Sequence, residues 1–164
     1  MDYLSQVPLT GSWFTTTLVK DAGATTISST LAWHFHIKGK SYLHAAATNL
    51  ATPTTDVNTG VAFVRVGTNE GCVYVLGWNA SGTLQVAQSA CVPLDASGLF
   101  VNAAVWPSIP DTMCPIGYMV TKCGSTAAAK ATGFLFGTTN FTAVTGQTNT
   151  MVEIGILPDR PQVS

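Results

Sequence analysis

The chain has 164 residues, of which 46% are hydrophobic but only 9% are charged, with 7 Lys and Arg against 8 Asp and Glu. A soluble domain usually has about 25% charged residues, so much of this surface must be covered in another way. The net charge of −1 excludes the basic face that nucleic acid or an anionic membrane requires. The length fits one domain.

Hydroxyl side chains replace the missing charges: 24 Thr and 11 Ser make up 35 of the 164 residues. These residues suit strands and turns better than helices, so an all-β fold is expected. No run approaches 18 consecutive apolar residues, and the first 14 residues combine neither a basic segment nor a continuous apolar one. We therefore expect no membrane span and no secretory signal.

The first thirty residues are rich in turn formers, including Pro8, Gly11 and Gly23, and alternate only weakly. They predict an extended N-terminal arm over residues 1–30, followed by a β-domain over 31–156 and an open tail over 157–164. Within the domain, Trp33, Phe35 and Ile37 alternate with polar residues up to Gly39, and residues 41–45 return as the second strand of a hairpin. Residues 50–60 predict a loop, and residues 61–67 a strand.

The clearest local pattern is a second hairpin over residues 71–91, with Asn79, Ala80, Ser81 and Gly82 between two β-rich runs. A two-residue turn at Ser81 and Gly82 would place Cys72 opposite Cys91, whereas a shift of one residue would move that pairing.

Three prolines between Trp106 and Pro115 predict a crossover loop, and a strand follows from Ile116. Residues 124–133 read as a small-residue loop, with a short helix over 125–131 as the alternative. Residues 134–137, 141–144 and 151–157 supply the last short strands. Eight to ten such strands predict an antiparallel β-sandwich or a jelly-roll-like barrel.

Catalytic motifs are absent from the sequence, including the nucleophile elbow, the phosphate loop and the HExxH zinc pattern. The six aspartates lie beside Pro, Gly or hydroxyl residues and are expected to form turns. Only Glu70 and Glu153 remain as a carboxylate pair, and a glycosidase would need both in one cleft. We expect no enzymatic activity and no cofactor.

The three histidines are the candidate metal ligands. His34 and His36 share one face of a strand. A three-residue turn over 38–40 would bring His44 onto that face, whereas a two-residue turn at Lys38 and Gly39 would place it on the other. In an oligomer, His34 and His36 from several chains would also meet on a symmetry axis. The alternative is an ordinary polar or hydrogen-bonded role, and no metal is expected.

The four cysteines do not follow the CxxC spacing of zinc or redox motifs. Cys72 and Cys91 are expected as reduced, packed thiols, with oxidation after release from the cell as the alternative. Cys114 and Cys123 bracket an extended strand and lie too far apart to bridge.

Several segments resemble a group of virion proteins of tailed bacteriophages. They are KGKSYLHAAAT, GCVYVLGWNASGTLQVAQ, WPSIPDTMCPIGYMVTK, FGTTNF and LPDRPQVS, which together span roughly residues 31–164. The most telling part runs from Ile109 to Val120 and continues with residues 136–141. The resemblance implies a small β-domain that decorates or cements a capsid or forms a head fibre, as an oligomer and without catalytic residues.

These observations predict a structural virion protein, made in the host cytoplasm, that forms a trimer and binds the major capsid protein on the outer capsid surface. Neither nucleic acid nor a membrane is expected as a partner. The alternative is a phage fibre or receptor-binding module that recognises surface glycans through Trp78, Tyr74 and Tyr42. The residues expected at the interfaces are Tyr3, Leu4, Trp13, Phe14, Trp106, Pro107, Ile109, Pro110, Leu157, Pro158 and Pro161.

Overall fold

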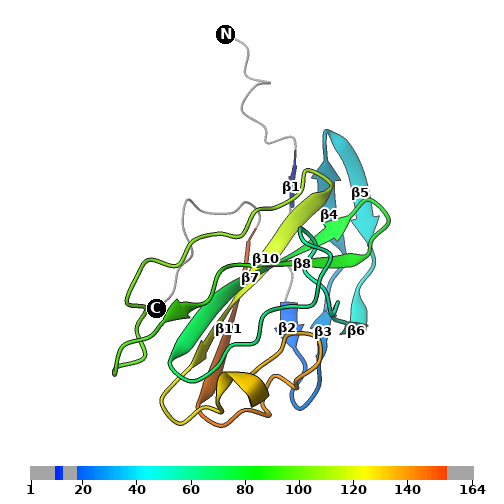
Figure 1. Ribbon diagram of the computed structural model, residues 1–164. Coiled ribbons are helices and arrows are strands. Elements are labelled where there is room, and N and C mark those ends of the chain that lie inside the picture. Colours follow the sequence, from blue (N-terminus) through cyan, green and yellow to red (C-terminus); the bar gives the residue numbers. More distant parts are fainter. Residues whose placement is uncertain (1–9, 13–17, 155–164) are drawn as a thin grey trace.

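The computed structural model describes residues 10–12 and 18–154. In this part, the chain forms eleven β-strands and one 3-10 helix, η2 (Lys130–Thr132). All strand pairs are antiparallel, and none of the three sheets closes into a barrel (Figure 1). The all-β prediction is confirmed, and the open sheets are consistent with a sandwich. Among the described residues, no helix has the length and apolar character needed to cross a membrane.

The largest sheet forms the centre of the molecule. Its strand order is β11 (Gln147–Glu153), β10 (Met113–Cys123), β7 (Glu70–Asn79) and β8 (Leu84–Gln88), with β9 (Val92–Pro93) also paired to β7. Both faces of this sheet are covered. On β7, Tyr74 and Trp78 point into the larger core, whereas Val73 and Val75 pack into a second, smaller core on the other face. This explains why β7 reads as an almost continuous apolar run.

A bulge in β10 changes which residues face each core. Pro115 pairs with Gly77, and Gly117 pairs with the next β7 residue, so Ile116 is the extra residue. As a result, Cys114 before the bulge, the extra residue Ile116 and Met119 after the bulge all face the larger core. Proline lacks an N–H for a regular ladder, so a bulge is a favourable place for it.

Two three-stranded sheets pack against this centre. One contains β1 (Gly11–Ser12), β4 (Trp33–Ile37) and β5 (Lys40–His44), and the other contains β2 (Leu18–Lys20), β3 (Thr26–Ser29) and β6 (Ala47–Ala51). Leu18 and Ile27 are buried in the larger core together with Trp33 and Phe35. β2 and β3 lie within residues 1–30, which we predicted to form an extended arm, and they are instead strands of the domain. Ile27 is the only apolar residue of β3, and in β2 the buried Leu18 is followed directly by the exposed Val19, so periodicity does not reveal these strands.

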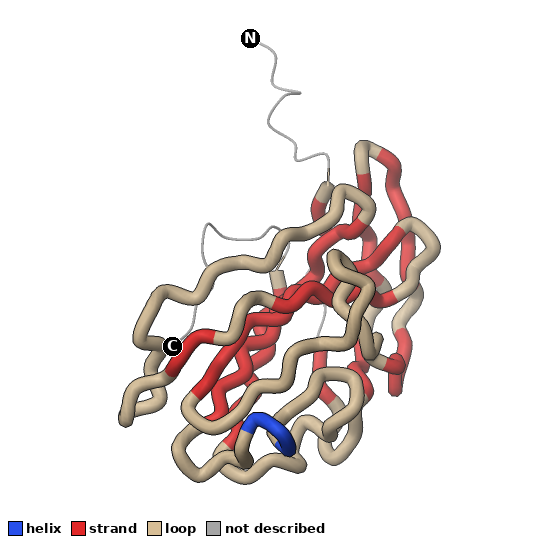
Figure 2. Tube along the Cα trace, viewed as in Figure 1, coloured by secondary structure: helices blue, strands red, loops and turns tan. Residues whose placement is uncertain are grey.

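Irregular segments complete the larger core. Figure 2 shows several loops at the lower end of the molecule. Phe134 and Phe136 pack with Phe63 and Phe141 around Tyr74. The predicted strands over 61–67, 134–137 and 141–144 are wrong, because these segments form only isolated bridges and turns. Their apolar residues are buried by packing between loops. The region 124–133 is a loop that ends in η2 and contains no longer helix.

Candidate functional site

The first hairpin decides the arrangement of the three histidines. In the pairing of β4 with β5, Ile37 faces Lys40 and Trp33 faces His44, so the turn contains only Lys38 and Gly39. Both turn residues have positive φ, 50° and 77°, as a two-residue hairpin turn requires. His44 therefore lies on the face opposite to His34 and His36. Among the described residues, no group of three His, Cys, Asp or Glu side chains could hold a metal ion.

The histidines differ in environment as well. His34 is exposed, His36 is only 7% exposed, and His44 is half-buried. The His44 imidazole stacks on the Trp78 indole, with ring centroids 3.9 Å apart and planes 11° apart, and its Nδ1 lies 2.7 Å from the Ala45 carbonyl oxygen. His44 thus joins β5 to the central strand β7, a structural role that its place in the sequence does not reveal.

The aromatic residues considered for glycan binding are mostly inside the protein. Trp78 and Tyr74 are both 0% exposed, so neither offers an open ring face to a sugar, and this residue assignment is wrong. Tyr42 is half-buried and stacks on Phe35. It helps to line a pocket of about 110 Å³ with His34, Phe35 and Ser41.

Four of the six aspartates are described. Asp21, Asp56 and Asp95 bind backbone or hydroxyl groups of their own turns, as predicted, whereas the Asp111 side chain forms an ion pair with Lys38. Asp56 Oδ1 accepts hydrogen bonds from the backbone N–H groups of Asn58 and Thr59, each at 2.9 Å, and Oδ2 accepts one from Gln88 at 2.7 Å. The contact of Oδ2 with Gln88 connects the loop around Asp56 to β8. Asp21 accepts hydroxyl hydrogen bonds from Thr26 and Ser28, and Asp95 accepts N–H groups of its own turn.

The two glutamates do not share a cleft. Glu70 faces Cys123 from β7, whereas Glu153 faces Gly117 from β11. These positions on β10 lie six residues apart, which corresponds to about 20 Å along a strand. Paired carboxylates of glycoside hydrolases lie within about 10 Å of each other. Glu153 instead accepts a hydrogen bond from the Leu18 backbone.

The crossover between β9 and β10 covers the smaller core. The Phe100 ring lies against Gly71, where an added Cβ would approach it to 2.8 Å, and the Lys122 ammonium lies 5.5 Å from its centroid. Trp106 packs edge-on against Tyr118, with ring centroids 4.9 Å apart. Pro107 is buried, and Ile109 and Pro110 are half-buried. Their predicted role at an interface stays a prediction.

The same crossover presents an outward set of apolar side chains. Leu99, Val101 and Val105 are 55%, 60% and 60% exposed, and Ala103 between them is exposed as well. Phe100, Ala104 and Trp106 of the same segment pack into the smaller core, whereas Asn102, at a bend over residues 101–102, is exposed. We call Leu99, Val101, Ala103 and Val105 the apolar row. The sequence does not predict the apolar row, because the inward residues of this segment are apolar too.

The other predicted contact residues lie outside the residues that the structure describes. They are Tyr3, Leu4, Trp13, Phe14, Leu157, Pro158 and Pro161.

Cys72 and Cys91 meet, although the predicted turn is wrong. Asn79 pairs with Thr83 around a three-residue loop that ends at Gly82, which has φ 72°. Tyr74 accordingly faces Gln88, and this register would place Cys72 opposite Ala90. However, β9 pairs Gly71 with Val92, so the register shifts by one residue after Gln88. Continuing the β9 register brings Cys91 opposite Cys72, as the sequence analysis had proposed.

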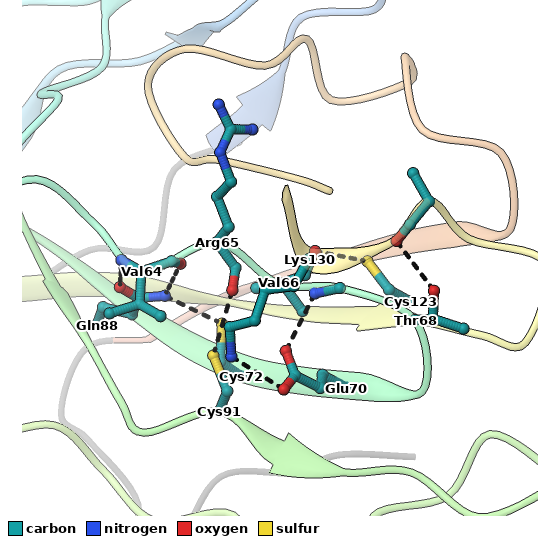
Figure 3. Close-up of polar contacts among 12 residues, drawn as sticks. Val64, Arg65, Val66, Thr68, Glu70, Cys72, Gln88, Cys91, Cys123 and Lys130 are labelled. Atoms are coloured by element: carbon teal, nitrogen blue, oxygen red, sulfur yellow. Dashed lines mark hydrogen bonds and ion pairs between the residues drawn. The ribbon is translucent and has the colours of Figure 1, made fainter. Parts of the chain in front are cut away.

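A polar cluster surrounds these thiols (Figure 3). Cys72 is fully buried and its sulfur accepts a hydrogen bond from Gln88 Nε2 at 3.7 Å, whereas the half-buried Cys91 thiol donates to the Arg65 carbonyl at 3.9 Å. Beside them, Lys130 Nζ forms an ion pair with Glu70 at 2.9 Å. Figure 3 shows the sulfur atoms of Cys72 and Cys91 next to each other.

The environment makes the two thiols unequal. Burial raises the pKa of Cys72 well above its usual value, and the hydrogen bond with Cys91 adds to the increase. The pKa of Cys91 is lowered, first by the hydrogen bond from Cys72 and then by the Lys130 charge, although partial burial opposes both. Burial also raises the pKa of Cys114 to about 12 and that of Cys123 to about 11. Cys91 is the most acidic of the four thiols.

No family model matches the chain, and no curated protein or solved structure shows significant similarity to it.

Proposed function

We propose that the chain is a structural virion protein of a tailed bacteriophage, made in the host cytoplasm, which forms a trimer and binds the major capsid protein on the outer capsid surface. The proposal assigns no catalysis and no cofactor to the chain. It rests on the apolar row, supported by the scarcity of charge and by the resemblance of residues 109–141 to phage virion proteins.

The apolar row supports an interface because of its geometry. Three large side chains, Leu99, Val101 and Val105, are exposed on one short segment. Phe100, Ala104 and Trp106 of the same segment pack into the smaller core. A contiguous apolar surface on a soluble protein usually marks a contact with another macromolecule. An interface of ordinary size would cover about 800 Å² on each partner, which this segment alone does not supply. The neighbouring Ile109 and Pro110 extend the surface in our proposal.

The low charge supports the same proposal. A monomer with 9% charged residues has few groups to keep its exposed surface soluble, whereas a subunit that buries part of its surface needs fewer. A three-fold arrangement matches the symmetry axes between capsomers without mismatch.

The test locates the protein on the particle and then disrupts the apolar row. Gold-labelled antibody against this chain is applied to purified particles of the phage that carries the gene. Labelling over the capsid surface supports the proposal, labelling confined to the tail favours the fibre alternative, and unlabelled particles contradict both.

The matched variants use exposed valines. Val101→Lys with Val105→Lys places two charges in the apolar row, and Val61→Lys with Val64→Lys places two charges at exposed positions elsewhere, which are 61% and 53% exposed. In our proposal the apolar row is the contact between subunits and only the trimer binds the capsid, so the first pair is expected to reduce capsid binding at least tenfold and the second to leave it within twofold. Equal binding by both pairs would contradict the role of the apolar row.

A further inference from the structure

The contact between Cys72 and Cys91 has the geometry that a disulfide requires. In the β9 register, Glu70 faces Pro93, and Cys72 faces Cys91 two residues further along. Proline has no N–H, so its pair belongs to the non-hydrogen-bonded type, and so does the cysteine pair because the two types alternate. Cα atoms in such pairs lie about 4.5 Å apart, within the range that a disulfide spans.

The remaining cysteines are excluded as partners by the same register. Cys72 pairs with Thr121 on β10, and Cys123 lies two residues beyond, in a diagonal position. Diagonal Cα atoms lie about 7–8 Å apart, beyond the usual disulfide limit of about 7 Å. Cys114 pairs with Trp78, six residues along β7 from Cys72.

The two thiols also differ in access. Cys91 is half-buried beside the Lys130 ammonium, whereas Cys72 is 0% exposed behind it. An external oxidant can therefore reach Cys91 first. A thiolate is the attacking species in disulfide exchange, so the lower pKa of Cys91 favours the same order.

We propose that Cys72 and Cys91 form an oxidation site, at which a small-molecule disulfide converts the thiol pair to a cross-strand disulfide. The Cys91 thiolate attacks one sulfur of the external disulfide and releases one thiol, leaving a mixed disulfide on Cys91. The Cys72 thiol then gives its proton to the thiolate released in the first step, and its sulfur attacks the Cys91 sulfur and expels the second external thiol as a thiolate, which takes up a proton from water. In sum, two protein thiols lose two electrons and two protons, and one external disulfide is reduced to two thiols.

The disulfide would restrain the start of the crossover between β9 and β10. The new bond would fasten the chain just before β9 to the central strand β7, eight residues before Leu99, the first residue of the apolar row. Cys72 and Cys91 enclose a loop of about 20 residues, so the bond reduces the conformational freedom of the unfolded chain. The inference does not rest on the proposed function, because it concerns the described domain in any oligomeric state.

The experiment treats the fully reduced protein with oxidised glutathione, blocks remaining thiols with an alkylating reagent and maps the peptides by mass spectrometry. We expect one linkage, between the peptides that contain Cys72 and Cys91, with Cys114 and Cys123 alkylated only after unfolding. The midpoint of thermal unfolding should rise by about 5–10 °C on oxidation. A linkage to another cysteine, or a stable glutathione adduct on Cys91 of the wild-type chain, would overturn the proposal.

Variants separate the two steps. In Cys72→Ser the second step is missing, so glutathione should remain attached to Cys91. In Cys91→Ser, Cys72 should stay unmodified because it is buried. Cys114→Ser is the matched control and should form the disulfide as the wild type does. Modification of Cys72 in the folded Cys91→Ser variant would contradict the assigned order of attack.

The charges beside Cys91 provide a test that folding defects cannot imitate. Lys130→Gln removes the cation that lowers the pKa of Cys91, whereas Glu70→Gln removes the anion that raises it. Both variants break the same ion pair, yet the first should slow the oxidation and the second should accelerate it at neutral pH. Changes of the same sign in both variants would exclude Cys91 as the entry thiol.

Discussion

His44 on β5 stacks on Trp78 of β7, with ring centroids 3.9 Å apart, and so joins the first hairpin to the central sheet. The indole is completely buried beneath the imidazole and the neighbouring strands. This contact lies where two sheets that share no backbone ladder meet. It fixes the position of the hairpin relative to the core.

We expect His44→Ala to lower the free energy of unfolding by about 1 kcal/mol, because a stacked aromatic pair contributes about that amount beyond its buried area. Leu43→Ala is the matched control on the same strand. Leu43 is 63% exposed, so its loss should be within about 0.5 kcal/mol. Urea unfolding followed by tryptophan fluorescence measures both. Equal losses would show that the stacking adds nothing to the stability.

Gly77 is expected to tolerate no side chain. A Cβ at this position would lie 2.4 Å from the Cys114 carbonyl oxygen and 2.7 Å from side-chain atoms of Met113. Gly77→Ala should therefore cost about 1–3 kcal/mol through overpacking where β7 meets β10. The control is Gly124→Ala, where the nearest atom is the Gly146 carbonyl oxygen at 3.6 Å. Thermal unfolding should separate the two variants clearly, and similar midpoints would contradict the close packing.

Asp56 is expected to hold the 55–62 loop against β8. Asp56→Ala removes the acceptor for Asn58, Thr59 and Gln88 and should cost about 2–3 kcal/mol, since it leaves backbone N–H groups unpaired. Asp56→Asn should cost less, because one carboxamide oxygen can still serve the turn. Asp111→Ala is the control at an exposed site, where the side chain only forms a surface ion pair with Lys38. Chemical denaturation gives the order, and an equal cost for Ala and Asn would contradict this account.

The Glu70 pair with Lys130 should make a small, pH-dependent contribution to stability. Partial burial alone would raise the pKa of Glu70, but the hydrogen bonds from Lys130 and Gly67 and the Lys130 charge lower it below 4.5. The stabilisation is therefore complete above pH 4.5 and is lost as the pH falls through the lower pKa of the folded state. A surface pair of this kind contributes about 0.2–1 kcal/mol.

Denaturation of the wild type and of Glu70→Gln at pH 7 and at pH 3 measures this contribution. The wild type should be the more stable at pH 7, and the difference should shrink towards pH 3. A difference that grows on acidification would reverse the sign of the pKa change.

The sequence predicts local features well where short-range chemistry determines them. The hairpin from Trp33 to His44 follows from alternation and from Gly39 in its turn. The sequence could not decide on which face of the hairpin His44 lies, because one residue more in the turn would move His44 to the other face. The strands at Leu18 and Ile27 were missed because each carries a single buried apolar residue and depends on pairing with a distant partner.

The thiol pair shows how a correct contact can follow from an incorrect turn. The prediction placed a two-residue turn at Ser81 and Gly82, whereas the structure has three loop residues. The error is cancelled near Ser89, where the side-chain oxygen accepts the Val73 N–H and the backbone N–H donates to the Val73 carbonyl. Such a compensation cannot be read from the hairpin pattern. Lys130, far along the chain, gave no signal of its place beside Cys91.

In our proposal, the apolar row joins the subunits of an oligomer. The most direct measurement is the native mass of the purified protein by light scattering, for the wild type and for Val101→Lys with Val105→Lys. We expect a wild-type mass near three times 17.1 kDa. The variant should shift towards the single-chain mass while its circular dichroism stays that of a β protein. A wild type that remains at 17.1 kDa at high protein concentration, or a trimer that the two lysines leave unchanged, would contradict the proposal.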